Sequence, residues 1–297
     1  MSATGSSAAP PEVALVTGAS RGAGKGIALA LGAKGMTVYL TGRSLSSSLG
    51  RLKDTPLPGT LLETAAAVSA LGGKGIALAC DHRDDAAVQA AVARVATESG
   101  RLDILVNNAA SIHDALIDPG GFWEKPLELA DILDVGLRSA YVVSYFAAPL
   151  MVRARRGLIA FVSSFGASCY MHGPAYGAQK AGLDKFAADM AVDLAPHGVA
   201  ALSLWLGPQL TERTAAAGRS RPEQYAAFLS QAETPQFNGR IIYALACDPQ
   251  LAQLSGQTLI SAEVAHRYGI TEEDGRAPPS YRQLLGAPRV PHPAKVQ

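Results

Sequence analysis

The sequence predicts an α/β protein with a single domain, in which helices cover both faces of a doubly wound parallel sheet of about seven strands. Two observations predict this fold. Short apolar runs alternate along the chain with longer stretches of helical periodicity. These runs are apolar at almost every position, which is typical of parallel strands buried on both faces. At 297 residues, the chain has the length of one large α/β domain.

The expected elements alternate from the start of the chain to its end. Strands are expected at residues 13–16, 36–41, 75–80, 102–106, 158–162, 199–206 and 258–261. Helices are expected at 27–31, 61–71, 84–99, 127–152, 175–195 and 237–247. The connecting segments 42–58, 111–126 and 207–235 are long, and the last has the composition of a mobile segment with one helical piece near Tyr225.

A glycine-rich turn joins the first strand to the first helix. It reads Thr17-Gly18-Ala19-Ser20-Arg21-Gly22-Ala23-Gly24, with its glycines spaced G-x-x-x-G-x-G. Glycines allow a tight turn and a close approach of the backbone to a ligand, and the free N–H groups of the following helix attract phosphate. The turn therefore predicts a nucleotide site; a glycine-rich turn without a ligand is the alternative.

Small or polar residues follow most of the expected strands. In an open parallel sheet, ligands bind beyond the carboxyl ends of the strands. One edge of the sheet is therefore expected to carry a binding cleft, formed by Gly18, Gly42-Arg43, Asp81-His82, Asn107-Asn108, Ser163-Ser164 and Gly207-Pro208.

Tyr176 and Lys180 lie four residues apart in an expected helix and so share one face. A phenol with a pKa of about 10 is a poor base near neutrality, but a nearby cation lowers that pKa. Lys180 is placed to do this, and the serines at the end of the preceding strand are placed to bind a substrate oxygen. A solvated Tyr–Lys helix face is the alternative.

Charge and composition argue against several kinds of partner. A net charge of +1 provides no attraction to nucleic acid or to a membrane surface, and the longest apolar stretch, 140–152, is too short to span a bilayer. Residues 1–11 lack the basic start and apolar core of a signal peptide, so we expect a disordered leader. The three cysteines lie in apolar surroundings and are expected to be reduced core thiols of a cytoplasmic protein. No metal-ligand spacing is found among Cys80, Cys169, Cys247, His113, His172 and His197, so no metal site is expected.

Taken together, these motifs resemble the short-chain dehydrogenase/reductase family over residues 12–285, which implies a Rossmann-type fold. Within the family, the chain is similar to the branch of dehydrogenase/reductase member 1 through the segments 134–138, 203–205, 255–257 and 265–269. The motifs that carry the family resemblance are Thr17-Gly18-x3-Gly22-x-Gly24, Asp81, Asn107-Asn108-Ala109-Ala110, Ser163/Ser164, Tyr176-x3-Lys180 and Gly207-x3-Thr211.

The resemblance implies a role for each motif. Tyr176 would be the general acid/base and would also contact the cofactor. Lys180 would lower the pKa of Tyr176 and hold the nicotinamide ribose, and one serine would position the carbonyl. Asp81 and His82 would border the adenine. The remaining cofactor contacts would come from Gly18, Ser20, Arg21, Gly22, Gly24, Asn108, Ala109, Gly207 and Thr211.

Two questions stay open at this point. Counting back from Tyr176 favours Ser163 as the catalytic serine, whereas counting from Gly157 favours Ser164, which we choose. Many family members carry Asn at the position of Gly136, where it helps to hold a water that links the lysine to solvent. Glycine keeps the backbone carbonyl but loses the side chain. The proton relay would therefore be rebuilt, with Ser139 as a candidate, or it would be slower.

A second departure from the family pattern lies at residues 206–208. The usual order in the family is Pro-Gly, whereas this chain reads Leu206-Gly207-Pro208.

Cofactor choice is predicted from the end of the second strand. An acidic residue there would bind the free ribose 2′-hydroxyl of NAD(H) and repel a 2′-phosphate. Here the strand ends in Gly42 and Arg43, and Arg21 is a second cation in the glycine-rich turn. Because a guanidinium binds phosphate with two parallel hydrogen bonds, the sequence predicts NADP(H), with Arg51 and Lys53 as further candidate contacts. The alternative is that these arginines and this lysine are ordinary loop charges that face the solvent.

The predicted function is therefore an NADP(H)-dependent carbonyl reductase acting on a ketone or aldehyde and its alcohol. An apolar cleft under segment 207–235 would suit a bulky hydrophobic substrate. A dinucleotide-binding sensor or scaffold with little turnover is the alternative. The resemblance also implies a homodimer or homotetramer formed through helices 127–152 and 175–195. We expect the catalytic domain to span 12–285, followed by a flexible tail at 286–297.

Overall fold

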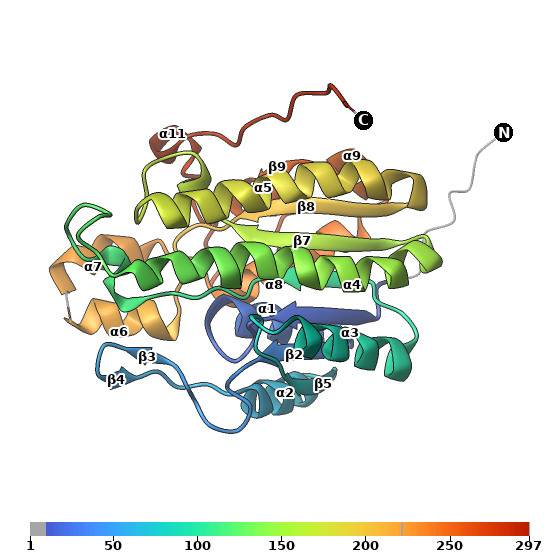
Figure 1. Ribbon diagram of the computed structural model, residues 1–297, viewed down its shortest axis with the longest axis horizontal. Helices are drawn as coiled ribbons and strands as arrows, with labels where there is room; N and C mark the ends of the chain where they lie inside the picture. Colours follow the sequence, from blue (N-terminus) through green and yellow to red (C-terminus); the bar gives the residue numbers. More distant parts are fainter. Residues whose placement is uncertain (1–9, 221, 297) are drawn as a thin grey trace.

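A single parallel sheet of seven strands organises the molecule (Figure 1). The computed structural model describes residues 10–220 and 222–296. The order of the strands across the sheet is β5-β2-β1-β6-β7-β8-β9, and every pair is parallel. The strands are β1 (Val13–Thr17), β2 (Thr37–Gly42), β5 (Lys74–Ala79), β6 (Ile104–Asn107), β7 (Gly157–Ser163), β8 (Val199–Trp205) and β9 (Thr258–Ile260). The predicted fold class is confirmed.

Helices cover both faces of the sheet and divide the core into two halves. One half contains side chains of α1 (Gly22–Gly32), α2 (Leu61–Ala70) and α8 (Pro235–Cys247). The other contains side chains of α3 (Asp85–Ser99), α4 (Ser139–Ala154) and α5 (Pro174–Leu194). Strand residues alternate between the two halves, so that β1 places Ala14 and Val16 on one side and Val13 and Leu15 on the other. This is why the strands read as continuous apolar runs.

The expected helix at 127–152 is interrupted, and this prediction is corrected. Leu127–Ala130 forms a 3-10 turn, and Leu133–Arg138 forms a π-type turn that contains two residues with non-helical angles, Val135 and Gly136. Gly136 has φ +147°, which side chains rarely adopt. The regular helix α4 therefore begins only at Ser139, after the break.

The long connections contain more structure than the sequence pattern predicts. A small antiparallel ribbon, β3 (Arg51–Leu52) and β4 (Thr55–Pro56), lies within 42–58. Segment 207–235 holds two helices rather than one, α6 (Glu212–Ser220) and α7 (Pro222–Ser230), because Pro222 begins a new helix. Three short helices were not predicted either: α9 (Leu251–Leu254), α10 (Ser261–Tyr268) and α11 (Arg282–Leu285).

The two ends of the chain carry little regular structure in the part described. The expected leader, 1–11, lies outside the described residues except for Pro10 and Pro11. Residues 286–296 form neither helix nor strand. Within the described residues, one helical stretch, Leu127–Ala154, is long and apolar enough to cross a bilayer, with a mean hydropathy of 1.3. Half of its most apolar part is buried inside the protein, as in a core helix.

Candidate active site

The turn between β1 and α1 is too closely packed to accept side chains at two of its glycines. A Cβ on Gly18 would lie 2.8 Å from the Cα of Ala109, and one on Gly24 would lie 2.4 Å from the carbonyl oxygen of Gly18. Gly18 and Gly22 also have positive φ, +66° and +59°. The glycine spacing is therefore required by the path of the backbone, whether or not a ligand is present.

Asn108 and Thr17 hold this turn against the end of β6. The Asn108 side-chain amide donates to the carbonyl oxygens of Thr17 at 2.8 Å and Gly18 at 3.2 Å. The Thr17 hydroxyl accepts from the backbone N–H groups of Asn108 and Ala109, both at 2.9 Å. Asn108 and Ala109 thus shape the floor of the site through the backbone.

A cavity of about 500 Å³ opens beyond the carboxyl ends of β1, β2, β5 and β6. Of the predicted cofactor residues, Gly24, Gly207, Tyr176 and Lys180 do not line it. Gly24 instead packs beneath the turn, and a Cβ on Gly207 would meet a carboxylate oxygen of Glu233 at 2.6 Å. Those that do line the cavity are Gly18, Ser20, Arg21, Gly22, Arg43, Asp81, His82, Asn108, Ala109 and Thr211.

The chemistry of this cavity fits a dinucleotide. The N-terminus of α1 faces it, as phosphate binding requires. Burial lowers the pKa of His82 to about 4, so its ring is neutral, and its Nε2 lies 3.0 Å from the Thr41 hydroxyl. Its other nitrogen, Nδ1, is buried without a hydrogen-bond partner among the described residues. An unpartnered ring nitrogen at the wall of a nucleotide cleft is suited to a polar edge of a base.

The predicted phosphate-binding cations differ in how they are held. The Arg21 guanidinium donates to Ser44, Ser48, and the carbonyl oxygens of Pro58 and Gly59, at 2.9–3.2 Å. Arg43 is exposed at the cavity wall, and no hydrogen bond or ion pair is recorded for its side chain within the described ranges. Lys53 lines a second cavity, where its ammonium lies 3.9 Å from Asp118, so its suggested phosphate contact stays a prediction.

Ser164 and Tyr176 meet beside the end of β7. Their hydroxyl oxygens are 2.9 Å apart. Gly166 allows the contact, because a Cβ there would lie 2.5 Å from the tyrosine ring. Ser163, the alternative, faces away and donates to the backbone carbonyl of Lys180 at 3.1 Å. Neighbouring residues of an extended chain point in opposite directions, so only one of the two serines reaches Tyr176.

Lys180 lies on α5, one helical turn after Tyr176. Its ammonium donates to the carbonyl oxygen of Val162 at 3.1 Å and lies 5.4 Å from the centre of the Tyr176 ring. Burial lowers the pKa of Lys180 to about 8, against the opposing effect of the Asp184 carboxylate. Asp184 is itself fixed by Ser203 at 2.6 Å and by the Trp205 indole at 2.9 Å.

The protein alone does not produce the expected lowering of the Tyr176 pKa. Burial raises the pKa of this phenol, and the hydrogen bond from Ser164 opposes the rise only in part. The Lys180 ammonium, 5.4 Å from the centre of the ring, does not offset the effect of burial. An activated phenolate would need further positive charge in the cleft.

Gln179 is a site residue that sequence reasoning missed. Its side-chain amide donates to the carbonyl oxygen of Gly136 at 3.1 Å, and its own oxygen is buried without a recorded partner in the described chain. The suggested relay residue Ser139 instead accepts from the backbone N–H of Gly136 at 3.1 Å. The signal in the sequence that pointed to such a contact was the absence of Asn at position 136. Glycine has no side chain there, so the polar contacts at this position come from other residues.

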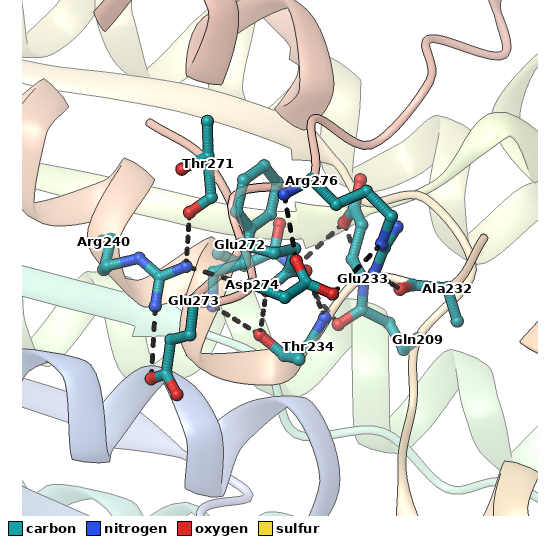
Figure 2. Close-up of polar contacts among 12 residues, drawn as sticks. Gln209, Ala232, Glu233, Thr234, Arg240, Thr271, Glu272, Glu273, Asp274 and Arg276 are labelled. Atoms are coloured by element: carbon teal, nitrogen blue, oxygen red, sulfur yellow. Dashed lines mark hydrogen bonds and ion pairs between the residues drawn. The ribbon is translucent and has the colours of Figure 1, made fainter. Parts of the chain in front are cut away.

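A buried polar network, also missed, joins the two ends of segment 207–235 (Figure 2). The Glu233 carboxylate accepts from Gln209 at 2.8 Å and from Asn238 at 3.0 Å. On the other side of the network, Arg276 donates to the carbonyl of Ala232 at 2.8 Å, as Figure 2 shows. These residues come from distant parts of the chain. The network therefore anchors segment 207–235, which is expected to form the substrate side of the cleft.

Among the described residues, no group of three or more histidine, cysteine or acidic side chains is arranged to hold a metal ion.

Comparison with known proteins places the chain in one family. The sequence profile of short chain dehydrogenases matches residues 12–222. "Dehydrogenase/reductase SDR family member 1" of Mus musculus is 40% identical over 92% of this chain and 87% of its own length. The reductase FabG of Escherichia coli, a 3-oxoacyl-[acyl-carrier-protein] reductase, is 31% identical over 84% of this chain and 94% of its own.

Solved structures agree with this assignment. A putative dehydrogenase from Xanthomonas campestris superposes with a TM-score of 0.73 and 29% identity, covering 95% of this chain and 97% of the other. Family members bind nicotinamide dinucleotides, which the cavity described above fits. The chain therefore belongs to the short-chain dehydrogenase/reductase family of oxidoreductases and, within it, resembles the member 1 proteins.

Proposed function

We propose that the protein is an NADP(H)-dependent enzyme that interconverts a ketone or aldehyde and the corresponding alcohol. The observation that carries this proposal is the 2.9 Å contact between the Ser164 and Tyr176 hydroxyls, with Lys180 on the same face of α5. Two hydroxyls at this separation can bind one carbonyl oxygen together, and one of them can transfer a proton to it.

When bound, the reduced dinucleotide supplies a hydride to the carbonyl carbon. The part played by the chain is proton transfer and orientation. Ser164 donates a hydrogen bond to the substrate oxygen, which fixes the carbonyl beside the phenol. Tyr176 gives its proton to that oxygen as negative charge develops there, and takes it back in the oxidative direction. Lys180, held by the Val162 carbonyl, supports the phenolate left behind.

We assign the 2′-phosphate of NADP(H) to Arg43. This arginine lines the cavity directly after β2, and none of the lining residues that segment 42–58 contributes is acidic. Arg21 supports the phosphate site from its position against Ser44 and Ser48, and Arg51 lines the same wall.

The proposed substrate is bulky and hydrophobic. Phe165, which follows the catalytic serine, packs with Trp205 and Tyr281 at centroid distances of 5.1 Å and 6.2 Å. Cys169, Met171 and Leu285 join this cluster. Phe165 and Trp205 are buried, and Cys169, Met171, Tyr281 and Leu285 are only partly buried. An apolar cluster that begins directly after Ser164 supports a carbonyl carried on an aromatic or steroid-like body over a small charged ketoacid.

The proposal is tested with a panel of carbonyl compounds assayed with NADPH and with NADH. NADPH-dependent reduction of bulky apolar ketones supports it. Activity confined to small charged ketoacids would contradict the substrate class. The Gly136–Gln179 contact favours one alternative, a dinucleotide sensor, because the Gly136 carbonyl that would hold a relay water is already bonded. Tight cofactor binding without turnover on any carbonyl would support that alternative.

We also propose that the enzyme is a cytoplasmic homodimer or homotetramer formed through α4 and α5. Tyr141 and Tyr145 on α4 are 50% and 64% exposed, and their rings stack at 6.5 Å. Phe186 of α5 lies 5.8 Å from Tyr141, so an aromatic surface extends across both helices. Aromatic side chains gathered on one surface are typical of subunit interfaces.

A further inference from the structure

The N-terminus of α1 is bonded to an acidic side chain from a distant part of the chain. The backbone N–H of Gly22, the first residue of α1, donates to a carboxylate oxygen of Glu212 at 2.8 Å. Locally, α1 has neither a side-chain cap nor an acidic residue in its first turn. Glu212 is 190 residues away in the sequence and begins α6 of segment 207–235.

This N–H group points at the place where a dinucleotide's pyrophosphate is expected. Helix N-termini in this fold bind the pyrophosphate through their free N–H groups. Glu212 lines the same cavity as Gly22 and Ser20. The methyl group of its neighbour Thr211 is 3.6 Å from the position that a Cβ on Gly22 would take. A carboxylate and a phosphate cannot both accept from this donor without strong repulsion between like charges.

From these contacts we propose that Glu212 is a resident anion of the pyrophosphate site, which the cofactor displaces when it binds. The inference rests on the proposed dinucleotide cofactor and adds a residue that sets its affinity. Glu212 lowers that affinity in two ways: it occupies the N–H group, and its negative charge repels the incoming phosphates.

The contacts of the next residue explain how Glu212 is kept in place. Arg213 forms an ion pair with Asp114 at 3.0 Å and donates to the backbone carbonyl of Arg51 at 2.9 Å. It thereby ties α6 to the β3–β4 ribbon, which lies beside α6 in Figure 1. The positive charge of Arg21 also attracts the Glu212 carboxylate. Burial lowers the pKa of Arg21, and the nearby Glu212 charge opposes that effect by raising it.

Displacement of Glu212 therefore couples the cofactor site to the substrate side of the cleft. When the carboxylate leaves Gly22, the start of α6 loses a contact that holds it over the cavity. Segment 207–235 belongs to the same polypeptide stretch, so its position depends on whether the pyrophosphate is bound. Cofactor binding before substrate is the expected order.

The test compares Glu212→Gln with the wild type in titrations followed by NADPH fluorescence and, for ADP, by calorimetry. Removing the charge should tighten binding of both ligands about tenfold, which corresponds to about 1.4 kcal/mol. The neutral amide accepts more weakly from Gly22 and does not repel the phosphates. ADP is included because it carries the diphosphate without the nicotinamide. The control is Glu223→Gln, an equal charge change at an exposed position on α7, which should leave both affinities unchanged.

Unchanged or weaker NADPH binding by Glu212→Gln, with tight binding by the wild type, would overturn the role of Glu212. A simple helix cap would lower the Tm of the variant and would not raise its affinity. If neither protein binds NADPH, NADH or ADP, the proposed cofactor fails, and the inference fails with it.

Discussion

The hydroxyl oxygens of Ser164 and Tyr176 lie 2.9 Å apart, while Ser163, the adjacent residue, bonds to the backbone of Lys180 instead. This relationship distinguishes two serines for which counting along the sequence gives opposite answers. It also provides a matched pair of variants, because the same substitution can be made at neighbouring positions with different contacts.

Replacing Ser164 by alanine should lower kcat by about 100-fold or more, because a donor to the developing alkoxide is lost. Ser163→Ala is the control: it removes the hydrogen bonds of Ser163 to the Lys180 carbonyl and to the Asp184 carboxylate, and should cost about 2 kcal/mol of stability with little change in kcat. Steady-state kinetics and urea unfolding measure the two effects. The opposite pattern would assign catalysis to Ser163.

Tyr176→Phe should lower kcat by at least about 100-fold, since the proton donor is absent. The ring and its packing against Gly166 remain, so NADPH affinity should be unchanged. Turnover close to the wild-type value would refute general acid catalysis by Tyr176.

Arg43→Asp should weaken NADPH binding about tenfold or more while sparing NADH, because the change removes a phosphate contact and adds a repelling charge. Arg94→Asp makes the same change of net charge on α3, far along the chain from this wall, and serves as the control. Fluorescence titration with both cofactors gives the affinities. Equal wild-type affinity for NADPH and NADH, or no effect of Arg43→Asp, would overturn the assignment of NADP(H).

His82 should make the protein sensitive to acid. Its folded pKa is about 4, whereas the unfolded chain has the ordinary value of about 6.5. Between these values the unfolded state binds more protons than the folded one, so the free energy of unfolding falls as the pH falls. The fall is about 1.4 kcal/mol per pH unit, or about 2 kcal/mol between pH 7.5 and pH 5.

His82→Gln keeps a partner for the Thr41 hydroxyl but does not titrate, so its loss of stability over this pH range should be smaller by about 2 kcal/mol. Urea unfolding at the two pH values measures the difference. The exposed His266, changed to glutamine, is the control. An identical pH dependence of wild type and His82→Gln would show that His82 is not responsible.

Tyr141→Asp combined with Tyr145→Asp should convert the assembly to monomers, because charges would be buried in the aromatic surface of α4. Light scattering reports the mass. Tyr170→Asp is the control, as Tyr170 is 85% exposed and lies outside α4 and α5. A wild-type monomer would refute the proposed interface.

The sequence by itself determined the architecture. Helices cover both faces of the sheet, so the central strands are apolar on both sides, as in β1, β2, β6, β7 and β8. Each of these apolar runs spans only a few residues and can therefore be recognised in the sequence. The glycines at 18 and 24 and the polar residues at strand ends were likewise found, since backbone geometry and the rule of carboxyl-end binding operate over a few residues.

The tertiary structure decided which groups contact one another across the site. The direction of a side chain at the end of β7 depends on the register of the strand, so Ser163 and Ser164 could not be separated by counting. Gln179 bonds to Gly136 because a break in the helix before α4 exposes that carbonyl. The contact between Glu212 and Gly22 joins residues 190 positions apart, and such contacts depend on how the whole chain packs rather than on any local pattern.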